Sequence, residues 1–254
     1  MSLPRTPSFR LDGKKALVVG ASSGIGFAAA VALAEAGAAV SLAARPSKKL
    51  EEAVEAVSSA GFIADGLALD ITDLDSISKT VASSGPFDVL VNSAGLAIHG
   101  PAIDTKVDDF DAVVAINVRG AYFLLQAVAR GLIEVGRTGS LVTISSQMAH
   151  VGGIDRAVYS GTKHAIEGFI KSMAIEWGGL GIRVNTICPT FVRTPLTDQT
   201  FSNPERVKWI TEKIKLGRIA NVEDIMAAVI YLASDASAMV TGTAMRVDGG
   251  WTAE

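Results

Sequence analysis

Short apolar runs alternate with longer alanine-rich runs along almost the whole chain, and this alternation limits the folds open to it. The apolar runs, predicted as strands, cover residues 16–19, 39–43, 63–69, 89–91, 140–144, 183–187 and 244–247. The runs predicted as helices cover residues 24–36, 47–60, 73–82, 107–134, 156–177, 203–214 and 222–233. Strands that alternate with helices of this length indicate βαβ units around a parallel sheet. Several strands are apolar throughout, as expected when helices cover both faces of the sheet.

The chain has 254 residues and no linker rich in proline, glycine or serine that would divide it. We therefore predict a single doubly wound, Rossmann-type α/β domain over residues 11–254. Residues 1–10 contain Pro4 and Pro7 and few side chains that pack. We predict that they form a loose N-terminal arm.

Composition excludes several classes of partner. The formal net charge is −3, and no basic stripe indicates nucleic acid. No apolar run reaches the roughly 18 residues that a membrane span needs; the longest, residues 27–34, is ended by Glu35. The single cysteine, Cys188, forms no intramolecular disulfide and suits a reducing, cytoplasmic setting.

The segment "VVGASSGIG" places Gly20, Gly24 and Gly26 between the first predicted strand and the first predicted helix. Glycines at this point let the backbone approach a pyrophosphate, and the helix N-terminus offers unpaired N–H groups to an anion. The spacing G-x-x-x-G-x-G differs from the commoner G-x-G-x-x-G, so a tight turn without a ligand is the alternative reading. The hydroxyl groups of Ser22 and Ser23 are candidates for further phosphate contacts.

The end of the second predicted strand bears on the choice of cofactor. NAD sites usually carry an acidic residue about 20 residues past the glycines. Here the segment reads "LAARPSKK", with neutral Ala44 and basic Arg45. Because an arginine can pair with a 2′-phosphate that a carboxylate would repel, the sequence favours NADP(H), with NAD(H) as the alternative. The simpler reading of Arg45 is a solvated loop charge.

The segment "YSGTK" places Tyr159 and Lys163 at positions i and i+4 of a predicted helix, on one face. An ordinary surface pair is the simpler interpretation. The catalytic one is that an ammonium beside a phenol stabilises the phenolate, which lets a tyrosine act as acid or base near neutral pH.

Taken together, these motifs resemble those of the short-chain dehydrogenase/reductase family. The resemblance covers nearly the whole chain, from Gly13 to Gly250. Besides the glycine loop and the Tyr-x-x-x-Lys pair, the chain carries "LALDITD", "NSAG", "INVRG", "ISS" and "CPTFVRT" in the family's order. The resemblance implies a seven-stranded sheet in the order 3-2-1-4-5-6-7. It implies a catalytic set of Asn117, Ser146, Tyr159 and Lys163.

The resemblance also implies which residues bind the cofactor. These are Gly20, Ser22, Ser23, Gly24, Ile25, Gly26, Arg45, Asp70, Ile71, Asn92, Ala94, Gly95, Tyr159, Lys163, Pro189, Thr190, Val192 and Thr194. Three positions depart from the family's pattern. Val19 and Ser93 replace a threonine and an asparagine, and Thr190 replaces a glycine close to the expected nicotinamide. Thr190 either narrows that pocket or supplies a hydroxyl contact.

The resemblance implies an enzyme that transfers hydride between a nicotinamide cofactor, preferably NADPH, and a small-molecule carbonyl or secondary alcohol. Ser146 and Tyr159 would contact the substrate, with His150 a weaker candidate. Residues 197–215 are interpreted as a helical lid over the substrate or as an ordinary surface helix. The three histidines, His99, His150 and His164, lack metal-ligand spacing, so no metal site is predicted.

Alternatives remain open at this level. An NAD-linked sugar or polyol dehydrogenase, a 3-oxoacyl-thioester reductase and a non-catalytic dinucleotide-binding protein all suit the same scaffold, although the intact catalytic set disfavours the last. The resemblance further implies a homotetramer, with the helices predicted over residues 107–134 and 156–177 at one interface.

Overall fold

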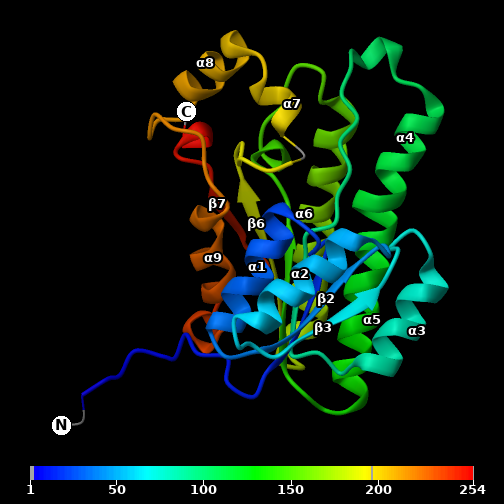
Figure 1. Cartoon of the computed structure of the whole chain (residues 1–254), viewed down its shortest axis with the longest axis vertical. Helices are drawn as coiled ribbons and strands as arrows, with labels where there is room; N and C mark the ends of the chain where they lie inside the picture. Colours follow the sequence, from blue (N-terminus) through cyan, green and yellow to red (C-terminus); the bar gives the residue numbers. More distant parts are fainter. Residues whose placement is uncertain (1–2, 196, 254) are drawn as a thin grey trace.

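The computed structural model describes residues 3–195 and 197–253. Within them, seven parallel strands form one sheet in the order β3-β2-β1-β4-β5-β6-β7, which confirms the predicted topology (Figure 1). The strands are β1 (Lys15–Val19), β2 (Ala39–Ala44), β3 (Ala64–Ala68), β4 (Val89–Asn92), β5 (Gly139–Ile144), β6 (Ile182–Pro189) and β7 (Ala244–Val247). β2 and β3 lie on one side of β1, and β4 to β7 lie on the other. The strand order therefore reverses between β1 and β4, and a crevice opens there at the carboxyl ends of the strands.

Helices cover both faces of this sheet (Figure 1). One face carries α1 (Gly24–Glu35), α2 (Lys48–Ser59) and α9 (Glu223–Ala233), and the other carries α3 (Leu74–Ser84), α5 (Ala121–Glu134) and α6 (Ala157–Gly178). Because side chains alternate along a strand, β1 serves both cores: Val18 packs with the α1 side, and Leu17 and Val19 pack with the α5 side.

The helix predicted over residues 107–134 has a break in its hydrogen-bond pattern. It consists of α4 (Val107–Val114), a π-helical segment Ala115–Gly120, and α5. By length and composition this run is apolar enough to cross a membrane, with a mean hydropathy of 1.5. Polar residues interrupt it, so a search for continuous apolar runs does not find it. Core helices pass the same test, and 44% of its apolar window is buried within the fold.

Two helices stand beyond the carboxyl ends of the strands, where a lid was predicted (Figure 1). They are α7 (Asp198–Phe201) and α8 (Pro204–Lys213). The Asn203 side chain begins α8 by accepting a hydrogen bond from the Arg206 backbone N–H at 3.1 Å, and Pro204 occupies the first turn.

Aromatic rings fix α8 to the end of the chain. The centroid of the Trp251 ring lies 5.4 Å from that of Trp209 in α8 and 5.6 Å from that of Phe191, which follows β6. Ile210 is fully buried in the cluster beneath them. The segment therefore has a small core of its own, separate from the two cores of the sheet.

Residues 3–10 are extended and exposed, without helix or strand. Their inner end is attached: the Ala236 backbone N–H donates to the Ser8 carbonyl at 3.1 Å, and the Phe9 ring lies 6.4 Å from that of Tyr231. Arg10 donates to the Glu35 carbonyl at 3.0 Å. The looseness predicted for residues 1–10 stays a prediction.

Candidate active site

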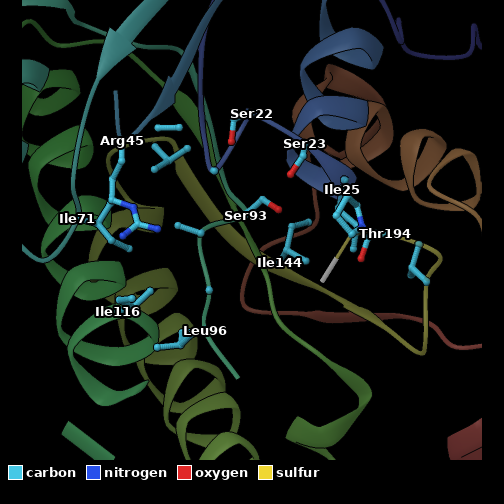
Figure 2. A pocket seen from close by; sticks show the side chains of 18 of the residues that line it. Ser22, Ser23, Ile25, Arg45, Ile71, Ser93, Leu96, Ile116, Ile144 and Thr194 are labelled. Atoms are coloured by element: carbon cyan, nitrogen blue, oxygen red, sulfur yellow. The ribbon is translucent and has the colours of Figure 1, made fainter. Parts of the chain in front are cut away.

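A cleft of about 900 Å³ runs across the carboxyl ends of β1, β2, β4, β5 and β6 (Figure 2). Its walls contain most of the site residues predicted from the sequence. These are Gly20, Ser22, Ser23, Gly24, Ile25, Arg45, Asp70, Ile71, Ala94, Gly95, Ser146, Tyr159, Lys163, Pro189, Thr190, Val192 and Thr194. Residues far apart in sequence thus meet at the predicted switch point of the sheet.

The glycine loop between β1 and α1 is tightly packed. Gly20 has a φ of +80°, and a Cβ there would lie 2.8 Å from the Ala94 backbone nitrogen. At Gly26 a Cβ would lie 2.1 Å from the Gly20 carbonyl oxygen. Ser23 occupies the N-cap of α1 but makes no capping hydrogen bond, so its hydroxyl is available to the cleft. The loop offers backbone and hydroxyl groups, as an anion at a helix N-terminus requires.

Basic side chains line the end of the cleft near β2. Arg45 follows β2, is exposed, and extends over the cleft close to Ile71 (Figure 2). Lys49, on α2, lines the same end. Asp70 bonds its neighbour instead: it accepts from the Thr72 N–H at 2.9 Å and the Thr72 hydroxyl at 2.8 Å. These bonds, with a smaller contribution from Arg45, lower the pKa of Asp70.

The segment after β6 lies over the glycine loop. Thr194 packs against Gly24, where a Cβ would lie 3.3 Å from the threonine side chain, and Ile25 lies beside it (Figure 2). Thr190 lines the cleft, and its hydroxyl is buried and has no hydrogen-bond partner in the part of the chain that the structure describes. An unsatisfied hydroxyl there favours the hydroxyl-contact interpretation of Thr190 over simple narrowing of the pocket.

Tyr159 and Lys163 lie together on α6, as their spacing predicts. The Lys163 Nζ is 5.6 Å from the centroid of the Tyr159 ring and donates to the Ile144 carbonyl at 3.0 Å. Lys163 is only 5% exposed, so its ammonium is held inside the cleft wall. His99 packs edge-on against the Tyr159 ring, with 6.2 Å between the centroids.

Ser146 follows β5 and faces the same part of the cleft. Its Oγ accepts a hydrogen bond from the Met148 N–H at 3.1 Å and caps the short 3-10 turn Gln147–Ala149. Because Oγ is used there as an acceptor, the hydroxyl hydrogen remains to donate to a substrate oxygen.

Asn117 lies in the π-helical segment and does not line the cleft. Its side chain brackets the backbone of Leu96, accepting from the N–H and donating to the carbonyl, both at 2.8 Å. It also donates to the Thr162 hydroxyl at 3.2 Å. Both amide hydrogens of Asn117 therefore have partners. A water linked to Lys163 can hydrogen-bond to Asn117 only by donating to one of its oxygen atoms.

Three other predicted site residues are not in the cleft wall. Gly26 faces the glycine loop from behind, and Asn92 is fully buried, where its oxygen accepts from the Ala94 N–H at 3.2 Å. His150 is exposed and lies away from the cleft. Gly26 and Asn92 support the loops that form the cleft wall. The predicted substrate contact of His150 gains no support from the geometry.

His150 lies instead beside two buried residues, Glu167 and Cys188. One ligand atom from each lies within 4.8 Å of the others, a grouping that sequence spacing does not show. Glu167 accepts from the Thr186 hydroxyl at 2.9 Å. Burial, and then Glu167, raise the pKa of Cys188 to about 12, so its thiol stays protonated. The Cys188 thiol is fully buried and donates to Glu167 Oε1 at 3.5 Å. The absence of a metal remains a prediction.

The cleft also contains residues that the sequence did not single out. They include Lys49, Leu96, Ile116, Ile144 and Ser145. Most are apolar or small, and only the tertiary fold shows that they face a ligand. Lys49 had a usable signal, since it follows Arg45 in "RPSKK".

The fold and this site define a class: a Rossmann-type oxidoreductase with a dinucleotide cleft and a Ser-Tyr-Lys arrangement at its inner end. A family model described as enoyl-(acyl carrier protein) reductase matches residues 20–252. The chain belongs to the short-chain dehydrogenase/reductase family.

Characterised relatives narrow the chemistry. The chain is 39% identical to D-threitol dehydrogenase of Mycolicibacterium smegmatis over 248 residues, 96% of this chain and 95% of that protein. It is 36% identical to gluconate 5-dehydrogenase of Gluconobacter oxydans over 248 residues, 96% of each. A solved gluconate 5-dehydrogenase from Burkholderia cenocepacia, in complex with NADP and tartrate, superposes with a TM-score of 0.93 at 33% identity, covering 97% of this chain and 98% of that one.

The protein is therefore an enzyme that transfers hydride between a nicotinamide cofactor and a carbonyl or secondary alcohol of a small molecule. Its cleft fits such a cofactor on three observations: the glycine cradle that a Cβ would fill, the uncapped Ser23 hydroxyl, and the unsatisfied Thr190 hydroxyl.

Proposed function

We propose that the enzyme is an NADP(H)-dependent reductase or dehydrogenase of sugar-derived carbonyl and alcohol groups. The observation that carries the cofactor preference is Arg45, which stands in the cleft where an NAD site would carry a carboxylate. Within the described residues Arg45 makes no ion pair, so its guanidinium is available to a 2′-phosphate. The threitol and gluconate dehydrogenases among the relatives support the substrate class.

The proposed roles follow from the geometry of the cleft. When bound, the cofactor supplies or accepts the hydride. Tyr159 gives the proton to the substrate oxygen in reduction, and Lys163, behind its ring, provides the positive charge that favours the phenolate afterwards. Ser146 donates its free hydroxyl hydrogen to the same oxygen. Asn117 positions the backbone at Leu96. The family resemblance further implies that Lys163 would hold the nicotinamide ribose and that Asn117 would hold a water beside Lys163.

We expect Arg45→Ala to weaken NADPH binding by about tenfold to a hundredfold, because it removes charge-assisted hydrogen bonds to the phosphate. NADH binding should change by less than about threefold, since NADH lacks that phosphate. Fluorescence titration with both nucleotides measures this. Lys48→Ala is the matched control, because Lys48 is exposed, pairs with Glu52 at 3.3 Å and lies outside the cleft.

Tighter binding of NADH than of NADPH by the unaltered enzyme would overturn the cofactor proposal. The NAD-linked sugar or polyol dehydrogenase would then become the leading candidate, and oxidation of polyols would be assayed first.

We also propose that the enzyme is a homotetramer. Apolar side chains are exposed on the helices expected at the interface: Val107, Phe110, Phe123 and Ile133 on the α4–α5 run, and Ile175 on α6. Static light scattering should give four times the 26.3 kDa chain mass. A monomer would contradict the proposal.

A further inference from the structure

Arg156, at the start of α6, is a buried cation without a partner. Arg156 is only 7% exposed, and its Nη1 has no hydrogen-bond partner within the described residues. Among the residues that the structure describes, no carboxylate lies within ion-pair distance of it. A guanidinium remains charged at every physiological pH, and burying it unpaired is strongly unfavourable. Such a group calls for an anion that the protein itself does not supply.

The position of Arg156 relates it to the catalytic tyrosine. Arg156 is the N-cap residue of α6, three residues before Tyr159, and the two side chains interact electrostatically. The ring of His99 meets that of Tyr159 edge-on, 6.2 Å away. Burial, and then the positive charges of Arg156 and Arg206, lower the pKa of His99 from 6.5 to about 4. His99 therefore lies both against the Tyr159 ring and within electrostatic reach of the two arginines.

The second arginine comes from α8. Arg206 lies in α8, beyond the carboxyl ends of the strands, and is half-buried. It acts electrostatically on Arg156 as well as on His99. Arg156 and Arg206 therefore bring two like charges, from separate elements, into the electrostatic surroundings of His99. The first turn of α6 contains no acidic residue, so the positive end of the helix dipole adds to them.

We infer that this corner binds a carboxylate on the substrate, with Arg156 as the main donor and Arg206 as a second donor from α8. The inference rests on the proposed function and narrows its substrate class from sugars in general to sugar acids, the aldonates and their keto derivatives. An arginine fork matches both oxygens of a carboxylate. The substrate's carboxylate end would then lie beside His99, and its reacting carbon beside Tyr159 and Ser146.

The charges at this corner favour a carboxylate over a phosphate. Asp155 also acts on Arg156 and on His99. Among the groups that act on Arg156 and His99, and with His99 neutral, two guanidinium groups and one carboxylate leave a single net positive charge. A carboxylate monoanion neutralises it, whereas a phosphate dianion would leave an excess negative charge beside Asp155.

The test compares matched substrates that differ only in charge. With NADPH, kcat/KM is measured for 5-keto-D-gluconate and for L-sorbose, in which CH2OH replaces the carboxylate. A further pair, D-fructose 6-phosphate and D-fructose, tests a phosphate at the same corner. Binding of gluconate and of glucitol to the enzyme with NADP+ is measured by calorimetry, which needs no turnover.

We expect the unaltered enzyme to prefer the carboxylate member of each carboxylate pair by about tenfold to a hundredfold. Arg156→Gln should remove that preference and change the neutral member by less than about threefold. Arg206→Gln should reduce the preference partly. Because Arg206 is only half-buried, its replacement should not prevent folding. This variant therefore tests the inference even where Arg156→Gln does not fold. Arg5→Gln, which removes one positive charge from the exposed arm, is the control and should change nothing.

Several outcomes would overturn the inference. They are equal use of both members of the carboxylate pairs, a preference for the phosphate pair alone, and an Arg156→Gln variant that loses both members equally. Gluconate binding without any NADPH oxidation would support the anion site while removing the proposed reductase function. Turnover of L-sorbose at the rate of 5-keto-D-gluconate would support the reductase function and remove the anion site.

Discussion

Replacing Tyr159 with phenylalanine should lower kcat by about 10²- to 10⁴-fold while leaving NADPH binding unchanged. The hydroxyl is the group placed to give a proton to the substrate oxygen, and loss of a positioned acid or base costs this range. The ring itself stays, so its packing against His99 and its position over Lys163 are kept. Steady-state reduction and fluorescence titration, run on one preparation, separate the two effects.

Tyr231→Phe is the matched control for this experiment. Tyr231 lies on α9, on the far side of the sheet, where its ring packs near Phe9. This substitution also removes a tyrosine hydroxyl but leaves the cleft unaltered, so activity should be unchanged. A Tyr159→Phe enzyme with full activity would show that another group, or water, delivers the proton.

Replacing Gly26 with alanine should abolish cofactor binding or prevent folding. The added Cβ would lie 2.1 Å from the Gly20 carbonyl oxygen and 2.7 Å from its carbon, both backbone atoms that cannot rotate away. The start of α1 or the glycine loop must therefore move. We expect an NADPH dissociation constant raised by about a hundredfold or more, since the loop's N–H groups would no longer converge on a phosphate.

Gly168→Ala tests whether the effect belongs to the position rather than to glycine replacement. Gly168 lies in α6, and a Cβ there would meet no atom within 4 Å. Because alanine is the better helix former by about 1 kcal/mol, this variant should be neutral or slightly more stable to heat. Normal NADPH affinity in Gly26→Ala would contradict the packing argument.

The sheet was predictable because most of its strands are short apolar runs bounded by turn residues, whereas β3 contains Asp65 and Gly66. The strand order came from the resemblance. The interruption in the helix over residues 107–134 was not predictable. A π segment keeps the same apolar composition, and only the inserted turn around Asn117 reveals it. The separation of α7 from α8 depends on the Asn203 cap, which no hydrophobic periodicity reports.

The site was predictable where a residue type is tied to a local turn or motif, as at Gly20, Arg45 and the Tyr159–Lys163 pair. It was not predictable where tertiary packing decides. Arg156 reads in the sequence as an ordinary charge before a helix, and only its burial without a partner marks it. The cytoplasmic setting that the single cysteine suggests remains a prediction.

The bracket that Asn117 forms has a consequence for folding. One amide joins the chain after β4, through Leu96, to the start of α6, through Thr162. These segments are distant in sequence and meet only when the middle of the sheet is assembled. A partly folded chain therefore lacks the arrangement around Lys163 even if its helices have formed. Recovery of turnover after denaturation reports the cooperative assembly of the whole sheet, whereas helical content reports only its parts.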